Sequence, residues 1–370
     1  MNTTIKEYFM NNYKKIGLTA LAGSLVTLGS AVAGELSVSG SVNATLVFGE
    51  QKQANNSSRT IGTDRDVTFS GGGELDNGVT FSVSTTTDDA LDVSASTTTI
   101  STPSMGSFTM GTSTGSASYM YDEEVPQAYE QSSDGQQNMS NQVGNFMDSN
   151  HVMYTAPAIE VAGATIQAHL GYSPQASDEA AGDGSQAAYS ATYGSGKEAG
   201  VTITYEGLKV GVYGAERQNV TPVAAGSDAV ADEFNGVWYA KYSFGPVSIG
   251  YSESYMDAGL TGSAEATTAA KKERTAAGLF EGEQMSIAFN VNDNMSISYT
   301  TSEETYDSQD DAATAVATDD DVAESTDAIQ VAYSMGGMSV KAYNMEVTNP
   351  DQDDDAADAS ITEIALGFAF

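Results

Sequence analysis

Residues 361–370 read Ile-Thr-Glu-Ile-Ala-Leu-Gly-Phe-Ala-Phe, and this stretch decides the class of fold. Ile364, Leu366, Phe368 and Phe370 share one parity, while the residues between them are small or polar. Alternation with a period of two predicts a β-strand with one apolar face. The terminal strand of an ordinary secreted β-protein would show the same pattern, because the signal of a single barrel strand is weak. The rest of the chain must therefore distinguish the two.

The start of the chain carries an export signal. Two lysines precede an apolar run over residues 16–32, and the run ends in Ala-Val-Ala. A basic region, a short apolar core and an A-x-A site are typical of a secretory signal peptide. The core is too short and too rich in Gly for a spanning helix. We predict a signal peptide over residues 1–33 and one mature domain over residues 34–370. A start at Met10 would give a signal of more ordinary length.

The composition excludes several classes of function. The formal net charge is −36, so the chain is not expected to bind nucleic acid through phosphate contacts. It contains no Cys, which excludes disulfides and thiol chemistry. Gly and Tyr are abundant, with 37 and 19 residues, as expected for strands and turns. No long apolar run follows the signal, but barrel strands need only alternate apolar residues.

Short turns alternate with long polar loops along the chain. The first predicted strand covers residues 35–48, a polar loop covers 49–63, and the longest loop covers 112–149. Outer-membrane barrels have short turns at one end, long loops at the other and an even strand count, and about sixteen strands fit this chain. A soluble sandwich has no reason to show this asymmetry. The sequence therefore predicts an all-β fold, a transmembrane antiparallel β-barrel with long external loops.

Four short motifs, in this order, resemble the general porins of Gram-negative outer membranes, nearest to their alphaproteobacterial branch. They cover residues 73–78, 105–111, 150–157 and 367–370. The resemblance implies a sixteen-stranded barrel, a homotrimer, and passive diffusion of ions and small hydrophilic solutes. It also implies that the third loop folds inward and narrows the pore. The C-terminal strand resembles the signal read by the barrel-assembly machinery, and outer-membrane lipid and lipopolysaccharide are the implied surroundings.

The chain departs from this family pattern in two places. Many relatives carry a cluster of Arg on the inward face of the first strands, but here Arg65 falls on the outward parity. The second loop, which in trimeric relatives latches onto a neighbouring subunit, is short. The second departure leaves the oligomeric state open.

Acidic residues of the third loop are the candidate constriction, because carboxylates in a confined opening attract cations and repel anions. These are Asp122, Glu123, Glu124, Glu130, Asp134 and Asp148. Solvated positions on the outer rim are the alternative for each. Strand parity predicts further pore-wall residues, namely Asp64, Asp66, Asp92, Lys209, Arg217, Lys241 and Lys341. We expect the four bases to face the loop across the pore and to give a transverse field.

Neither a bound cofactor nor catalysis is expected. The runs at residues 319–321 and 353–355 do not fit an EF-hand, so at most they hold Ca²⁺ or Mg²⁺ loosely as bridges to lipopolysaccharide. Residues 111–115 match G-x-S-x-G, but no helix follows them. Residues 194–197 lack the first Gly of a P-loop. The sequence thus predicts a cation-preferring outer-membrane porin. The alternatives are a substrate-selective channel and a non-conducting surface adhesin or structural barrel.

Overall fold

The computed structural model describes most of the predicted mature domain. The described residues are 35–51, 56–88, 92–112, 116–122, 124–132, 147, 151–176, 193–219, 231–259, 278–307 and 322–370. The predicted signal peptide lies outside them. No helix within these ranges is both long and apolar enough to cross a membrane.

The described chain is almost entirely β-strand. The first strands are β1 (Glu35–Gln51), β2 (Asn56–Glu74), β3 (Thr80–Thr87), β4 (Val93–Thr102), β5 (Gly106–Thr112), β6 (His151–Thr155), β7 (Ile159–Val161) and β8 (Ala164–Ser173). The others are β9 (Tyr193–Tyr205), β10 (Leu208–Asn219), β11 (Glu233–Phe244), β12 (Val247–Asp257), β13 (Leu279–Asn292), β14 (Met295–Asp307), β15 (Val322–Met335), β16 (Met338–Thr348) and β17 (Ala359–Ala369). Two short 3₁₀ helices, η1 (Ala117–Met120) and η2 (Pro350–Gln352), lie in connections.

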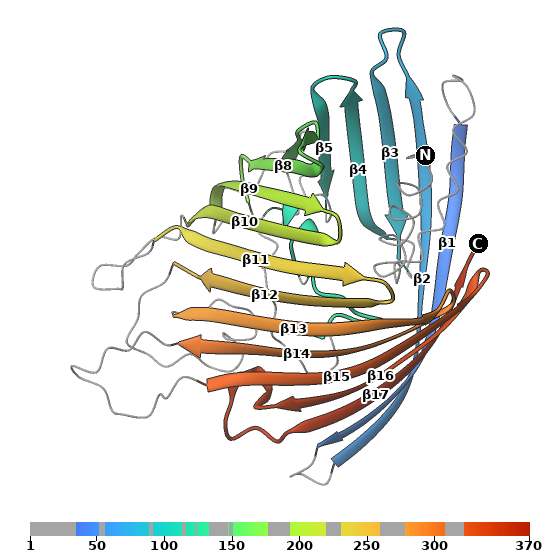
Figure 1. Ribbon diagram of the computed structural model, residues 1–370, viewed down its shortest axis with the longest axis vertical. Helices are drawn as coiled ribbons and strands as arrows, with labels where there is room; N and C mark the ends of the chain where they lie inside the picture. The colour runs from blue at the N-terminus through green and yellow to red at the C-terminus, as the bar shows by residue number, and fades with distance from the viewer. Residues whose placement is uncertain are drawn as a thin grey trace.

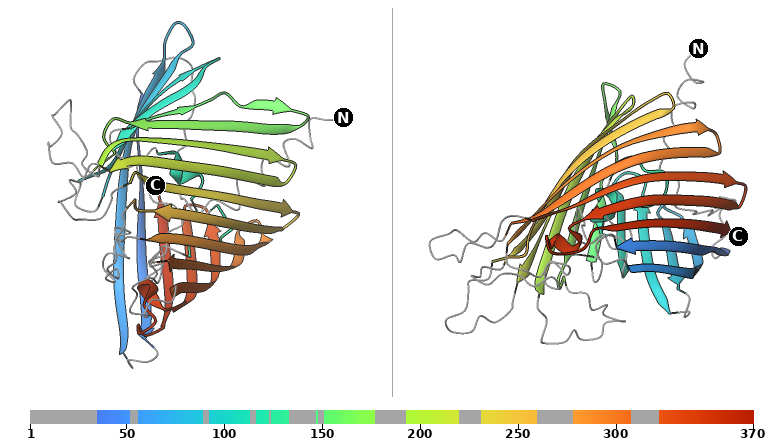
Figure 2. Two further views of the ribbon diagram at one scale, coloured as in Figure 1. Left: turned by 90° about the vertical axis from the view of Figure 1, so that its left-hand side faces the viewer. Right: turned by 90° about the horizontal axis from the view of Figure 1, so that it is seen from below.

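All strands join one antiparallel sheet that closes on itself. Strands that follow one another in the chain pair, except β6 with β7, and β1 also pairs with β17, from Ser41 opposite Ala369 to Gln51 opposite Ala359. Blue β1 accordingly lies beside red β17 (Figures 1 and 2). The segments β6 and β7 lie end to end opposite β8, so seventeen segments fill sixteen positions. The β1–β17 pairing joins the first strand to the last, as lipid requires of a spanning sheet. The predicted sixteen-stranded barrel is confirmed.

Side chains alternate between an apolar outer face and a polar inner face. On β13, Met285, Ile287 and Phe289 are exposed outside, whereas Gln284 and Ser286 are buried inside. Alternation of this kind is expected of a strand with lipid on one side and a polar lumen on the other. The exposed apolar residues therefore form the membrane-facing belt rather than a surface defect.

The predicted polar loop over residues 49–63 is wrong for residues 49–51 and 56–63, while residues 52–55 lie outside the described chain. β1 continues to Gln51, and β2 already begins at Asn56, with Gly49 opposite Ser58. These residues lack an apolar face, so the sequence pattern did not predict a strand there. Their pairing is instead held by backbone hydrogen bonds to β1, which any side chain permits.

Candidate functional site

The third loop, between β5 and β6, enters the barrel and begins on a buried carboxylate. Glu198 of β9 is 4% exposed and accepts hydrogen bonds from the Ala117 N–H and the Ser116 hydroxyl, both at 2.8 Å. The hydroxyl of Tyr213 on β10 donates to the same carboxylate at 2.8 Å. Ser116 also caps η1 by accepting from the Ser118 N–H. Glu198 therefore fixes the point where the loop meets the wall.

Aromatic rings fill the space behind the first turn of the loop. The hydroxyl of Tyr121 lies 2.8 Å from Nδ1 of His169 on β8, and its ring stacks on Tyr213 with centroids 5.3 Å apart. Tyr121, Tyr213 and Tyr239 belong to one buried cluster. Such packing excludes water from this side of the lumen, so the loop is part of the core here.

A three-member ion cluster holds the middle of the loop. The Glu124 carboxylate lies 3.1 Å from Nζ of Lys209 on β10, and Lys241 on β11 contacts the same oxygen. Both ammonium groups also lie within 6 Å of the Tyr239 ring centroid, at 5.3 and 5.9 Å. Burial raises the pKa of Glu124, but attraction to Lys241 and Lys209 outweighs burial and holds this pKa below its ordinary value.

The far end of the described loop reaches the last strands. The Ala128 N–H donates to the Ser298 hydroxyl at 2.9 Å, and the Tyr129 N–H donates to Gln330 Oε1 at 2.8 Å. Gln330 Nε2 in turn donates to the Glu130 carbonyl at 2.7 Å. The Tyr129 hydroxyl donates to Glu363 of β17 at 2.5 Å. The loop thus crosses the inner wall from β8 to β17 and confirms the expected inward fold.

The opposite wall, formed by β1–β5, borders the open part of the lumen. No described residue of these five strands is fully buried, in contrast to the inner faces of β9–β17. Hydroxyls pair across this wall, for example Thr68 with Thr86 at 2.9 Å and Thr99 with Thr109 at 3.0 Å. The described bases on these strands are Arg59 and Arg65, and both stand on the outward parity, opposite Phe48 and Val42.

The predicted acidic residues occupy different environments. Glu124 is ion-paired, whereas Asp122 and Glu130 are partly exposed along the loop. Asp64 and Asp66 lie on the inward parity of β2, opposite Asn43 and Ser41. Asp92 lies exposed just before β4, where its N–H donates to Asp88, rather than on a strand. Three of the predicted residues lie outside the described chain, namely Glu123, Asp134 and Asp148.

The predicted bases all point inward, but they do not face the loop across an open pore. Lys209 and Lys241 lie behind the loop and pair with Glu124. Arg217 donates to Glu233 at 2.5 Å, and the Lys341 ammonium lies 4.9 Å from the Tyr129 ring centroid. The bases thus lie on the wall that the loop covers, and the transverse field expected from them stays a prediction. The loop packs on the wall that carries them, because buried bases need adjacent acceptors.

Metal-ligand clusters are not found among the described residues. The run at 353–355 lies in a turn, where Asp353 Oδ1 accepts the Asp355 N–H at 3.0 Å. The run at 319–321 lies outside the described chain. Loose divalent bridging therefore stays a prediction.

Sequence reasoning missed the wall residues that dock the loop, above all Glu198, Gln330 and Glu363. Glu198 follows the Gly-Ser-Gly-Lys stretch, which does not match a P-loop. From the sequence, Glu363 is only one residue on the polar face of the last strand. No local sequence pattern marks these buried inward residues, because the loop residues that they contact lie far away in the sequence.

Solved structures of outer-membrane proteins, porins among them, share this architecture. The chain is similar to an anion-selective porin from Comamonas acidovorans, with 11% identity, coverage of 91% of this chain and 100% of that one, and a TM-score of 0.59. It is similar to OmpF of Salmonella typhi in a complex with daunomycin, with 11% identity, 91% and 98% coverage, and a TM-score of 0.63. It is also similar to the trimer form of OmpT, an outer-membrane protein of Vibrio cholerae, with 15% identity, 92% and 100% coverage, and a TM-score of 0.58.

A family model described as Gram-negative porin matches residues 17–279. The chain belongs to this family, and its barrel is an outer-membrane porin channel. A comparison with curated proteins gave no match.

Proposed function

We propose that the channel prefers cations and small neutral solutes, and that three copies assemble as a trimer. The cation preference rests on one observation, the composition of the open wall. The inward face of β1–β5 carries Asp64, Asp66 and many hydroxyls, and no inward base among its described residues. Fixed carboxylates beside a narrow aqueous path raise the local concentration of cations.

Bases on the other wall do not oppose this preference. Lys209 and Lys241 share the Glu124 carboxylate, and Arg217 pairs with Glu233. Their fields are partly cancelled at short range and are shielded from the open path by the loop. The fold alone gives no ion preference, since the similar Comamonas acidovorans porin is described as anion-selective.

The experiment is the reversal potential across a planar bilayer in a KCl gradient, with refolded residues 34–370. The expected reversal potential favours K⁺. The double variant Asp64→Asn with Asp66→Asn is expected to reduce the preference at unchanged folding, and the outward variant Arg59→Gln to leave it unchanged. If the parent channel prefers anions, the proposed cation preference is wrong, but the protein is still a channel. A folded barrel without conductance would instead favour the adhesin.

A substrate-selective channel is the second candidate, and the hydroxyl wall favours it. Paired Ser and Thr side chains such as Thr68 and Thr86 suit solutes that themselves carry many hydroxyls. Liposome swelling with sugars and with uncharged solutes of equal size but fewer hydroxyls separates the two candidates. Equal rates indicate a general porin, whereas faster sugar entry indicates selectivity.

The proposal also covers how the barrel assembles, what surrounds it and whether it catalyses a reaction. The C-terminal strand is proposed to be read by the barrel-assembly machinery, and acidic loops to bridge to lipopolysaccharide through Ca²⁺ or Mg²⁺. The trimer is supported by the shared fold with OmpT, whose trimer form is solved. The chain is proposed to have no enzymatic activity, and assay of the purified barrel for lipid hydrolysis tests this.

A further inference from the structure

Three buried polar side chains stand side by side on the inner wall behind the third loop. Ser252 of β12 pairs with Gln284 of β13, which pairs in turn with Ser302 of β14, and we call these three residues the buried row. Their exposed fractions are 0, 1 and 2%. Both serine hydroxyls and the Gln284 Oε1 atom have no hydrogen-bond partner among the described residues. Buried polar atoms without a partner are costly, so the row requires a partner from outside the described chain.

The amide of Gln284 makes one contact with the loop and leaves its other polar atom unpaired. Its Nε2 atom donates to the Ser132 hydroxyl at 3.0 Å. Rotation of the amide by half a turn would exchange its nitrogen and oxygen atoms, and Oε1 would then accept from the same hydroxyl. One of the two atoms would still lack a partner. The unpaired atom is therefore a property of the site in either amide orientation.

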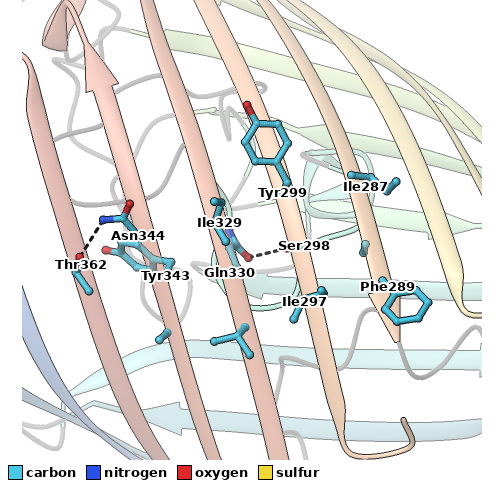
Figure 3. A pocket seen from close by; sticks show the side chains of 13 residues that line it. Ile287, Phe289, Ile297, Ser298, Tyr299, Ile329, Gln330, Tyr343, Asn344 and Thr362 are labelled. Carbon is cyan, nitrogen blue, oxygen red and sulfur yellow. Dashed lines mark hydrogen bonds between the residues drawn. The ribbon is translucent and has the colours of Figure 1, made fainter. Parts of the chain in front are cut away.

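Neighbouring positions of the same wall are bonded to the loop directly. Two residues along β13, the Ser286 hydroxyl donates to the Pro126 carbonyl. On β14, the Ser298 hydroxyl accepts from the Ala128 N–H at 2.9 Å. The same hydroxyl donates to Gln330 of β15 at 3.4 Å (Figure 3). The loop thus meets these positions through hydrogen bonds that the chain itself supplies, unlike the serines of the buried row.

The loop contributes unpaired groups of its own to this part of the wall. Both polar atoms of the Gln127 amide are buried, and neither has a hydrogen-bond partner among the described residues. Gln127 lies between Pro126 and Ala128, which bond to β13 and β14 respectively. These are the strands that carry Gln284 and Ser302. Unpaired donors and acceptors are therefore present on both sides of the contact between loop and wall.

The spacing of the buried row suits bridging water molecules. Paired strands lie about 4.8 Å apart, which is too far for a direct hydrogen bond between short side chains that stand upright on the sheet. Two oxygen atoms that share one water, each at roughly 2.8 Å and at a tetrahedral angle, are separated by a similar distance. Buried waters in proteins make two to four hydrogen bonds to polar groups that otherwise lack partners.

We propose that an ordered water molecule lies on each side of Gln284, between the wall and the third loop. Each water bridges the Gln284 amide and the neighbouring serine hydroxyl, and the Gln127 amide bonds to them from the loop. All these groups are neutral, and hydroxyls and amides both donate and accept, which favours water over a cation. The waters complete the docking of the loop on β12–β14. This site goes beyond the proposed ion preference and does not depend on it.

A crystal structure that resolves ordered water is the first test, with the refolded parent barrel soaked once in NaCl and once in RbCl. A density peak is expected on each side of Gln284, within hydrogen-bond distance of the neighbouring serine hydroxyl and equal in the two salts. A peak that grows in RbCl would identify a cation, and a loop side chain in its place would show a dry contact. Either result would overturn the inference.

Magnetic relaxation dispersion of the solvent gives a second test, because it detects water molecules that stay bound longer than the protein takes to tumble. The double variant Ser252→Ala with Ser302→Ala is expected to lose part of the signal of the parent barrel. The control is Ser248→Ala, a buried serine of β12 whose hydroxyl already has a partner, 2.7 Å away on Ser243. It is expected to keep the signal. Equal signals in the parent and the folded double variant would overturn the inference.

Single-channel recordings test whether the waters hold the loop. The double variant leaves the Gln284 amide without its bridging partners, so its open-channel noise is expected to rise above that of the parent and of Ser248→Ala. Noise at the parent level, in a folded variant that has lost the bound water, would show that the waters do not support the loop. If the double variant does not fold, the structure of the parent barrel still decides whether the waters are present.

Discussion

At the scale of single residues, the third loop is held by carboxylates that already have ion-pair or hydrogen-bond partners. Glu124 shares its oxygen with Lys209 and Lys241, and Glu198 accepts three hydrogen bonds. A buried charge is tolerated only with such partners. Removing one member therefore does more than delete a contact, since it leaves the other members uncompensated.

Replacement of Glu124 with Gln is expected to loosen the third loop. It leaves Lys209 and Lys241 close together without a counter-charge, at a cost on the order of 2 kcal/mol for loop docking. The expected results are higher open-channel noise and a shift in reversal potential toward anions in single-channel recordings. The matched control is Glu216→Gln, which breaks the exposed Lys197–Glu216 pair of 3.2 Å on the outer surface. Equal effects of the two variants would contradict the role of the buried cluster.

Acid is expected to loosen the same contact. The pKa of Glu124 in the folded protein lies below the ordinary value of 4.5, so its ionisation stabilises docking. This contribution is fully present above about pH 4.5 and is lost as the pH falls through the lower folded pKa. Channel noise recorded from pH 7 downward is expected to rise in that acidic range. The Glu124→Gln variant should not show this rise in channel noise. The same rise in the variant would mean that another group titrates.

At the scale of elements, the described part of the third loop is fixed at two points. Glu198 holds its beginning on β9, while Gln330 and Glu363 hold the stretch that lies against β15 and β17. The first teal part of the loop lies inside the curve of the sheet (Figure 2). Its position depends on side chains of the wall, so the pore width depends on strands far from the loop in sequence.

Replacement of Glu198 with Ala is expected to release the beginning of the loop. It leaves the Ala117 N–H and two hydroxyls without their shared acceptor, at a cost of roughly 2–4 kcal/mol. Larger sugars are then expected to enter more quickly in liposome-swelling assays, with barrel folding preserved. Asp76→Ala, in the exposed turn between β2 and β3, serves as the control and is expected to have no effect. Unchanged solute entry in Glu198→Ala would show that the loop is held elsewhere.

At the scale of the whole molecule, closure of the barrel depends on a tight seam. Gly40 and Phe370 exchange two backbone hydrogen bonds of 2.9 and 3.0 Å. A Cβ atom on Gly40 would lie 2.5 Å from the Phe370 ring, so no larger side chain fits without moving that ring. The last residue therefore closes the sheet by close packing as well as by pairing.

The variant Gly40→Ala is expected to destabilise closure by about 1 kcal/mol, because the Phe370 ring must leave its position. The measurement is the temperature at which the folded barrel loses its compact mobility in detergent electrophoresis. The control is Gly214→Ala, where the nearest atom to an added Cβ lies 3.8 Å away. If both variants unfold at the same temperature, the seam does not limit stability.

The sequence by itself determined the class of fold and the faces of the strands. Alternation is a local property with a period of two, so Lys209, Lys241 and Lys341 could be placed inward from their own strands. Prediction from alternation failed where polar residues stand on both faces, as at residues 49–63. Strands can pair there without any pattern of apolar residues. Predictions on residues outside the described chain, such as Glu123 and Asp148, stay predictions.

Only the tertiary structure decided which wall the third loop covers and which charges it cancels. Glu124 and Lys209 are 85 positions apart, and Tyr129 and Glu363 are 234 positions apart. No local pattern relates residues at such separations, since their contact arises only after the sheet has closed. The sequence thus shows which side chains enter the lumen, and the closed barrel decides which of them meet and which remain open to solutes.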